Sequence, residues 1–128
     1  MSINTSNFEK ALKSLDDVLK LPKDDIIRDS AIQRFEYSYE LGMKLLRRHL
    51  ENISESSIEI EHMSFKNLLR TGAEKGLIDD PVAWFEFREK RNMTSHTYNQ
   101  EKADMVYSCL PDFYKRSMFL LEKLKNEN

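Results

Sequence analysis

Residues that interrupt helices are scarce in this chain, and no other feature constrains its fold as strongly. The 128 residues include three glycines, at positions 42, 72 and 76, and three prolines, at positions 22, 81 and 111. Leu, Lys, Glu, Arg and Met outnumber Val, Ile and Thr, so intrinsic propensity favours helix along nearly the whole chain. No segment alternates apolar and polar residues as a half-buried strand would. The sequence therefore predicts an all-α protein.

Apolar residues recur at helical spacing in five segments, which are separated by capping and helix-breaking residues. The expected helices run from Ser6 or Asn7 to before Pro22, from Asp24 or Asp25 to about Glu51, from Phe65 to Gly72 or Gly76, from Pro81 to about Thr94 or His96, and from Thr97 or Asn99 through Leu124. The second segment would be ~40 Å long and has two apolar stripes, which is typical of the central helix of a bundle.

The connections between these segments allow an antiparallel up-and-down four-helix bundle with an additional short helix, folded as a single domain over residues 1–128. The polar, Ser-rich segment 52–63 is expected to be a loop or connector. Pro111 removes a hydrogen bond from the last helix, so we expect a kink or break near Cys109.

Composition excludes several classes of protein. The net charge of −2 argues against generic coating of nucleic acid, so any RNA contact has to come from a local patch. One cysteine allows neither an intrachain disulfide nor a Cys-rich zinc site, and the scattered glycines form no phosphate-binding loop. The chain has no apolar run near the ~18 residues of a membrane span and no signal-peptide stretch. We therefore expect a cytoplasmic protein without membrane contact.

Most of the potentially reactive side chains have a structural explanation. We expect His49 to be a cation at a helix end and His62 to be a solvated loop residue, so the sequence predicts no metal site and no cofactor. The paired carboxylates at positions 16/17, 24/25 and 79/80 lie at expected helix ends, where capping accounts for them. Cys109 is expected to be a core residue.

The segment 84–98, WFEFREKRNMTSHTY, is different because polar and titratable groups gather at the end of a helix. It contains Arg91, His96 and Tyr98, with Asn92 among the residues between them. A guanidinium binds two phosphate oxygens at once, an imidazole moves protons near neutral pH, and a tyrosine hydroxyl can accept a phosphoryl group. Together these groups suit phosphate chemistry that needs no metal.

The spacing of the two catalytic candidates sets a condition on the backbone. On an ideal helix, Arg91 and His96 would lie about 140° apart, and Arg91 would align better with Thr94. Convergence requires the helix to end or unwind before His96, which the capping signals at Thr97 and Asn99 allow. From spacing alone, a cationic helix end with a solvated histidine is the alternative interpretation.

The arrangement Arg91-x4-His96-x-Tyr98, in the last third of an all-helical chain of this size, resembles the RX4HXY motif of the HEPN family. The resemblance is closest to its small bacterial nucleotidyltransferase substrate-binding proteins, the HepT-like branch. It extends to the segments 34–44, 64–70 and 89–99, and so to nearly the whole chain.

This resemblance implies a homodimer that associates with a separately encoded minimal nucleotidyltransferase. In related toxin–antitoxin pairs, the HEPN member is a metal-independent ribonuclease, and the nucleotidyltransferase silences it by adding AMP to the motif tyrosine. By position, Arg91 would hold the scissile phosphate and His96 would transfer protons. Asn92 would have a supporting role, and Tyr98 would both support the motif and accept the AMP.

Elementary chemistry supplies a reason for pairing. RNA cleavage through the 2′-hydroxyl needs a base and an acid, yet one chain offers one motif histidine. A two-fold axis would bring both copies of Arg91 and His96 to one groove. The aromatic helix with Trp84, Phe85 and Phe87 has more apolar surface than one core contact needs, which favours a partner surface.

Three functions are compatible with these observations. The leading hypothesis is a ribonuclease toxin that binds single-stranded RNA in the motif groove. The second is a non-catalytic subunit that binds nucleotide or substrate in the same groove for its nucleotidyltransferase. The third is a helical adaptor without a ligand. The chain has no GS…DxD constellation, so it is not itself the transferase.

Overall fold

The computed structural model describes residues 3–126, and every regular element in this range is a helix. The prediction of an all-α protein is confirmed. The elements are α1 Ser6–Leu19, α2 Asp25–Ile53, α3 Ser57–Glu61, α4 Phe65–Glu74, α5 Pro81–Met93, the 3₁₀ turn η1 Thr94–His96, α6 Gln100–Ser108 and α7 Leu110–Asn126. None of the helices in this range is long and apolar enough to cross a bilayer.

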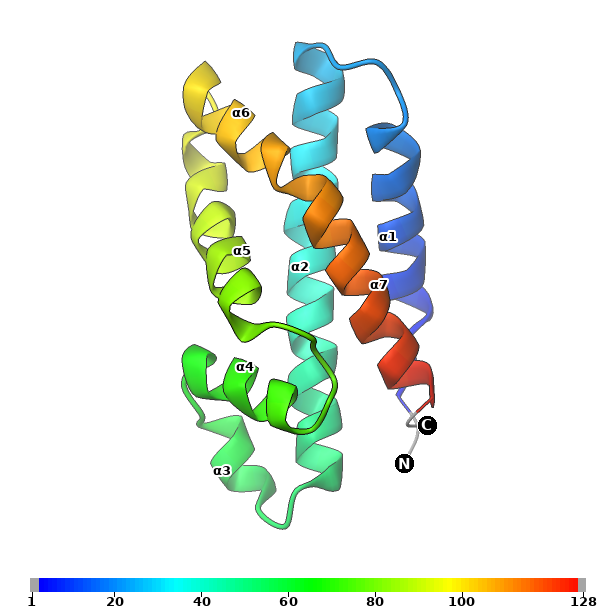
Figure 1. Ribbon diagram of the computed structural model, residues 1–128, viewed down its shortest axis with the longest axis vertical. Helices are drawn as coiled ribbons and strands as arrows, with labels where there is room; N and C mark the ends of the chain where they lie inside the picture. Colours follow the sequence, from blue (N-terminus) through cyan, green and yellow to red (C-terminus); the bar gives the residue numbers. More distant parts are fainter. Residues whose placement is uncertain (1–2, 127–128) are drawn as a thin grey trace.

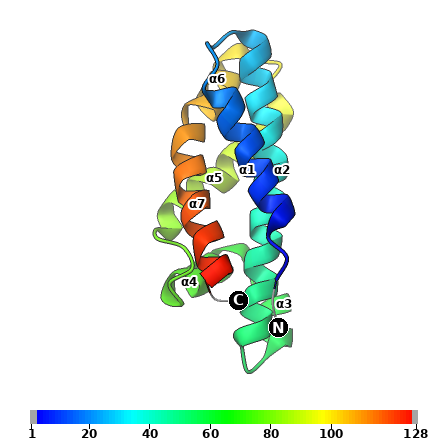
Figure 2. The ribbon, with the colours of Figure 1, turned by 90° about the vertical axis from the view of Figure 1, so that its right-hand side faces the viewer.

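The helices form an antiparallel bundle in which α1, α2, α5 and the α6–α7 pair alternate in direction (Figure 1). The predicted four-helix architecture is confirmed. The short helices α3 and α4 close the end of the bundle at which α2 finishes. Viewed from the side, α1 lies along α2, with α7 next to α1 (Figure 2). As expected for a central helix, α2 packs against each of the other α-helices.

Local capping signals begin the helices next to the motif. Asp24 accepts a hydrogen bond from the backbone N–H of Ile27 at 2.7 Å and so begins α2. Asp80 caps α5, where Pro81 occupies the first turn, and Asn99 caps α6. The carboxylates at positions 16 and 17 are not caps, because they lie in the last turns of α1 and pair with lysines of the same helix or its C-cap.

Two connections differ from a simple loop. The segment 52–63, expected to be a loop or connector, includes helix α3, which Ser56 caps. This helix lacks periodicity but buries Ile60, whose carbonyl accepts a hydrogen bond from Arg47 of α2 at 2.7 Å. The predicted break at Cys109 is confirmed, since α6 ends before it and α7 begins after it. It allows α6 and α7 to follow different directions (Figure 1).

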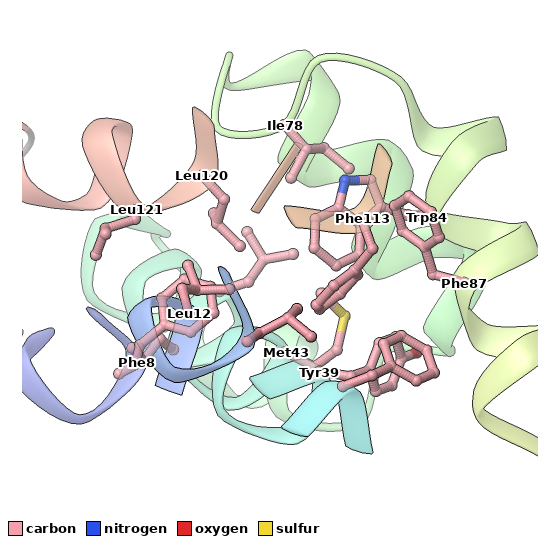
Figure 3. Close-up of a cluster of buried hydrophobic side chains, with 14 of the residues drawn as sticks. Phe8, Leu12, Tyr39, Met43, Ile78, Trp84, Phe87, Phe113, Leu120 and Leu121 are labelled. Atoms are coloured by element: carbon pink, nitrogen blue, oxygen red, sulfur yellow. The ribbon is translucent and has the colours of Figure 1, made fainter. Parts of the chain in front are cut away.

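The core is centred on aromatic rings that join α2, α5 and α7 (Figure 3). Phe113 makes edge contacts with Phe35 and Phe87, at centroid distances of 4.8 and 5.3 Å, and Trp84 packs against Phe87 at 5.2 Å. The expectation that Trp84 and Phe87 offer surface to a partner is wrong: their exposed fractions are 0% and 2% within one protomer. Their burial instead fixes α5, the helix that ends in the motif.

Candidate functional site

The motif segment begins in the last turn of α5 and continues through the 3₁₀ turn into a tight bend. The hydroxyl of Thr94 donates to the carbonyl of Arg91 at 2.7 Å, and the hydroxyl of Thr97 donates to the carbonyl of Thr94 at 3.1 Å. The N–H of Asn99 donates to the carbonyl of His96 at 3.1 Å. The α-helix therefore ends before His96, as convergence of the motif requires.

Arg91 is oriented by two partners. Its Nε donates to Glu40 Oε1 of α2 at 3.0 Å, and its Nη1 donates to Thr94 Oγ1 at 3.3 Å. The alignment of Arg91 with Thr94 is as predicted, but sequence reasoning missed Glu40. No local signal could have found it, because 51 residues separate Glu40 from Arg91. The Arg91 side chain is 32% exposed, so the guanidinium is both held and accessible.

His96 and Tyr98 lie together on the surface. Their ring centroids are 6.2 Å apart with an interplanar angle of 73°, and Tyr98 is 85% exposed. Asn92 is exposed on the same segment. Within residues 3–126, no hydrogen bond involves the side chains of these three residues. The structure thus joins His96 with Tyr98, and Arg91 with Glu40 and Thr94, but no hydrogen bond links the two groups.

Arg91 also lines a surface hollow between α1 and α2, with a volume of about 680 Å³. Lys10 and Ser14 come from α1, and Tyr37 and Glu40 come from α2. Tyr37 is 40% exposed, and its hydroxyl lies 3.3 Å from that of Ser14. A ligand in this hollow could contact the guanidinium and stack on an aromatic ring.

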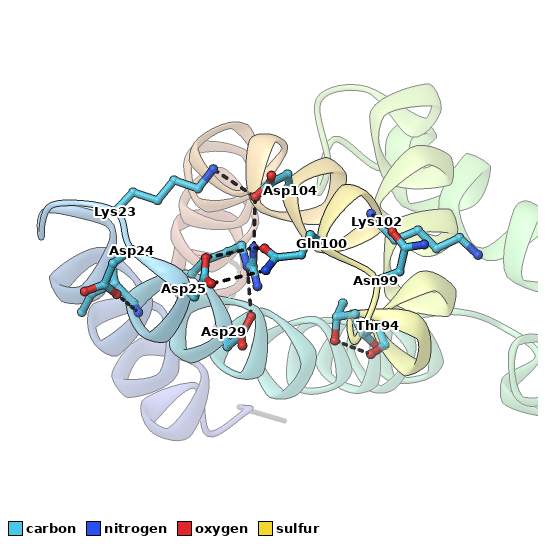
Figure 4. A network of polar contacts seen from close by, with 12 residues as sticks. Lys23, Asp24, Asp25, Asp29, Thr94, Asn99, Gln100, Lys102 and Asp104 are labelled. Carbon is cyan, nitrogen blue, oxygen red and sulfur yellow. Dashed lines mark hydrogen bonds and ion pairs between the residues drawn. The ribbon is translucent and has the colours of Figure 1, made fainter.

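A buried arginine of α2 holds α6, the helix that follows the motif; its partners Asp29, Gln100 and Asp104 are labelled in Figure 4. Arg28 of α2 is 4% exposed and donates from Nη1 to Gln100 at 2.8 Å and to Asp104 at 3.4 Å. Its Nε donates to Asp29 at 3.0 Å. Lys23 bonds to Asp104 at 3.0 Å, and it lowers the pKa of that carboxyl with additional help from Arg28. Sequence reasoning missed this network.

The remaining candidate residues contribute no visible chemistry. His49 is not a helix-end cation, because α2 continues to Ile53 and His49 faces the interior with 3% exposure. His62 is exposed at the end of α3, in agreement with its predicted solvation. Cys109 is partly buried against the core, and burial raises the pKa of its thiol to about 12. Residues 3–126 include no cluster of three His, Cys, Asp or Glu side chains that could hold a metal ion.

Known proteins resemble this chain over most of its length. A family model described as "Nucleotidyltransferase substrate binding protein like" matches residues 3–126. A Haemophilus influenzae protein named probable ribonuclease HepT is 43% identical over 104 residues, which make up 81% of this chain and 71% of that protein.

Two solved structures have the same fold. One, from Haemophilus influenzae, is described as revealing the fold of a substrate-binding domain of a nucleotidyltransferase. It matches with a TM-score of 0.90 and 36% identity, over 95% of this chain and 99% of that chain. The other, from Thermus thermophilus, matches with a TM-score of 0.80 and 31% identity, over 91% of this chain and 98% of that chain. The chain belongs to the family of nucleotidyltransferase substrate-binding proteins, in its HepT-like branch.

Proposed function

We propose that this protein is a metal-independent endoribonuclease that acts as the toxin of a two-gene system. The observation that most supports the proposal is an oriented, accessible guanidinium at Arg91, followed by an exposed imidazole at His96 beyond the unwound helix end. The name of the Haemophilus relative, probable ribonuclease HepT, points to the same activity.

The proposed reaction is transesterification within the RNA strand. A base removes the proton of a 2′-hydroxyl, and the 2′-oxygen attacks the adjacent phosphorus. The bond to the 5′-oxygen of the next nucleotide breaks, and an acid protonates that oxygen, so the products have a 2′,3′-cyclic phosphate and a 5′-hydroxyl. Arg91 would hold the phosphate and stabilise the charge that develops on its oxygens. His96 would supply a proton-transfer group, while Asn92 would help to position the strand.

A homodimer would supply both the base and the acid. One protomer has one His96, whereas two protomers related by a two-fold axis at the motif would provide two imidazoles and two guanidinium groups in one groove. Trp84 and Phe87 are used inside the protomer, so the interface has to come from other surfaces. Sizing chromatography tests this point: we expect a dimer, and a monomer of about 15.2 kDa would contradict the shared groove.

The test of the activity is cleavage of single-stranded RNA in EDTA by the purified protein. We expect cleavage by the wild type and a rate lower by about 10²- to 10⁴-fold in Arg91→Ala or His96→Ala. His62→Ala and Arg70→Ala are matched controls, since both residues are exposed and lie outside the motif, and they should cleave normally. Cleavage at the wild-type rate in both motif variants would contradict the proposal.

We further propose that a separately encoded minimal nucleotidyltransferase silences the protein by modifying Tyr98. The phenol oxygen would attack the α-phosphorus of ATP, pyrophosphate would leave, and the phenol proton would pass to solvent. The 85% exposure of Tyr98 supports this role, because another enzyme can reach the hydroxyl.

Mass spectrometry after incubation with the partner and ATP tests the modification. Wild type and Tyr37→Phe should each gain the mass of one AMP, whereas Tyr98→Phe should not. Tyr37 is the matched control because it is also exposed. Equal labelling of the Tyr98→Phe variant would exclude this site.

A second function is favoured by the family description and by that of the solved Haemophilus protein. The chain could serve as a non-catalytic subunit that binds nucleotide or substrate in the Arg91 hollow for the transferase. In this case the purified protein would cleave no RNA, and Arg91→Ala would weaken nucleotide binding measured by calorimetry.

A further inference from the structure

We infer that the outer face of α1 and α2 holds a second phosphate-binding site, which binds the RNA strand two to four nucleotides away from Arg91. The inference rests on the proposed ribonuclease function and names residues outside the motif. The site, here called the basic hollow, has a volume of about 270 Å³. It is lined by Asn4, Asn7, Phe8, Leu41, Lys44, Leu45 and Arg48.

The basic hollow adjoins the hollow that contains Arg91. Both are lined by Asn7 of α1 and Leu41 of α2, so they meet between these residues. A third hollow, about 560 Å³ in volume, shares Leu41, Lys44 and Arg48 with the basic hollow. A ligand at Arg91 that extends along α2 would therefore pass Asn7 and Leu41 and reach Lys44 and Arg48.

The cations of the basic hollow have no carboxylate partners. Lys44 and Arg48 are exposed, and none of the ion pairs within residues 3–126 includes either of them. The neighbouring Arg47 differs, because it donates to backbone carbonyls of the α3 segment. Asn4 accepts two hydrogen bonds from Ser6 through its side-chain oxygen, so its amide nitrogen is the group that can donate to a ligand. Two unpaired cations and amide donors form a site suited to phosphate.

The spacing along α2 matches a nucleic acid strand. Glu40 holds Arg91, and Lys44 and Arg48 follow one and two turns later, at ~6 and ~12 Å along the helix axis. One strand of a stacked B-form duplex carries a phosphate every ~3.4 Å along its axis, which sets the scale for a stacked strand. A strand whose scissile phosphate lies at Arg91 would thus place later phosphates beside Lys44 and Arg48. On the other side of Glu40 along α2, Tyr37 lines the Arg91 hollow and offers a ring on which a base can stack.

The carboxylates near the basic hollow line the two hollows that adjoin it, and both Glu40 and Glu51 line the third hollow beside Lys44 and Arg48. Glu36 and Glu40 line the Arg91 hollow, but Glu40 is paired with Arg91. Glu51 lines only the third hollow. The basic hollow itself includes no Asp or Glu among the described residues, although the chain as a whole has a net charge of −2. A polyanion is therefore favoured over a cationic or neutral ligand at this site.

The first experiment measures binding of a labelled single-stranded RNA of about 12 nucleotides by fluorescence anisotropy, in a His96→Ala background that leaves the RNA largely uncut. K44E/R48E should weaken binding about tenfold. The log–log salt slope should flatten by about 1.4, since each phosphate contact on a single strand contributes about 0.7. The neutral K44Q/R48Q variant should flatten the slope similarly without adding negative charge to α2.

A matched control is K66E/K115E, which makes the same change of net charge at exposed lysines outside all three hollows. It should bind RNA nearly as the parent does, and circular dichroism melting should show that all variants are folded. Unchanged affinity and slope in both Lys44/Arg48 variants would overturn the inference, as would an equal effect in the control.

Cleavage by otherwise wild-type protein separates this inference from the proposed function. A dinucleotide reaches only Arg91 and His96, so K44E/R48E should cleave it at the wild-type rate but cleave the longer RNA about tenfold less efficiently at low substrate concentration. If wild type cleaves nothing, the ribonuclease proposal fails while the binding test still stands. If K44E/R48E instead loses its dimer or its nucleotidyltransferase partner and binds RNA normally, the surface belongs to a protein and the inference is wrong.

Discussion

Two arginines, Arg28 of α2 and Arg91 of α5, show how differently the same kind of side chain is used. Arg28 is 4% exposed and contacts oxygens of Asp29, Gln100 and Asp104, which join α2 to α6. The Arg91 side chain is 32% exposed and has one carboxylate partner, Glu40, among the described residues. The first region satisfies its cation internally. The second leaves part of its guanidinium free for a ligand.

The two arginines therefore differ in role: Arg28 positions a helix, whereas Arg91 is the residue that we propose contacts the RNA. Removing a cation from water costs several kcal/mol, so a buried cation is stable only where well-placed partners offset that cost. The same contacts hold those partners in position. Arg28 holds the start of α6, which follows the motif directly. The Arg91 side chain is one-third exposed, which leaves room for the phosphate that we propose it binds. Changes at the Arg28 region should therefore alter stability, and changes at the motif should alter activity.

The largest expected effect is on catalysis. Arg91→Ala and His96→Ala should each lower RNA cleavage about 10²- to 10⁴-fold, the range that proton transfer and electrostatic stabilisation contribute. Both residues are accessible, so the free energy of unfolding should change by no more than about 1 kcal/mol. Cleavage rates and urea denaturation measure the two quantities. If either variant were destabilised enough to unfold under the assay conditions, the loss of cleavage would reflect unfolding, and the contrast between Arg91 and Arg28 would fail.

The next effect is on stability. Arg28→Met should lower the free energy of unfolding by about 2 kcal/mol, because it removes the cation that joins α2 to α6. The figure is below that of a fully buried pair, since the partner carboxylates are at least half exposed and can be hydrated. Urea denaturation measures it, with Arg70→Met as a control on the surface of α4. Normal stability together with lost cleavage would assign Arg28 to the chemistry instead.

A smaller effect sharpens the role of Glu40. Glu40→Gln removes the charge that competes with phosphate for Arg91 but leaves a side chain of the same size. KM for RNA should fall about threefold because the guanidinium is released, and kcat should fall because Arg91 is less well oriented. Glu36→Gln, on the same face of α2, is the control. If Glu36→Gln changed KM and kcat as Glu40→Gln does, the cause would be the loss of a negative charge near the site, and the contact between Glu40 and Arg91 would not be responsible.

The smallest effect is the pH dependence of the Arg28 region. Lys23 and Arg28 hold the pKa of Asp104 below its ordinary value of 3.8 in the folded protein. The unfolded chain therefore binds this proton more readily, and the contribution to stability is present above pH 3.8 and lost as the pH falls through the folded pKa. Melting curves should show a difference between wild type and Asp104→Asn at neutral pH that shrinks in acid. A difference that stays constant down to acid pH would contradict the role of Asp104.

The parts of the fold that follow from neighbouring residues were predictable. Asp80 with Pro81 marked the start of α5, Asn99 marked the start of α6, and Pro111 marked the break before α7. Each signal acts through the backbone within a few residues, so it can be recognised without knowledge of the fold. The sequence leaves the end of α5 open between Thr94 and His96, and the structure places it at Met93, next to the earlier of the two.

The parts that depend on distant contacts were not predictable. Helix α3 forms because Ile60 is buried and Arg47 binds its carbonyl, and His49 lies on the buried face of α2. The partners of Arg28 and Arg91 lie up to 76 and 51 residues away. No propensity or spacing encodes such pairs, so only the packed chain reveals which carboxylate holds the motif arginine.

The exposure of Tyr98 has a consequence for how this molecule could be controlled. Its ring contributes almost nothing to the packed interior, so a bulky group could be attached to it or removed from it while the native state persists. Switching at this position would be as quick as the modifying enzyme itself. It would require neither new synthesis nor degradation of the chain.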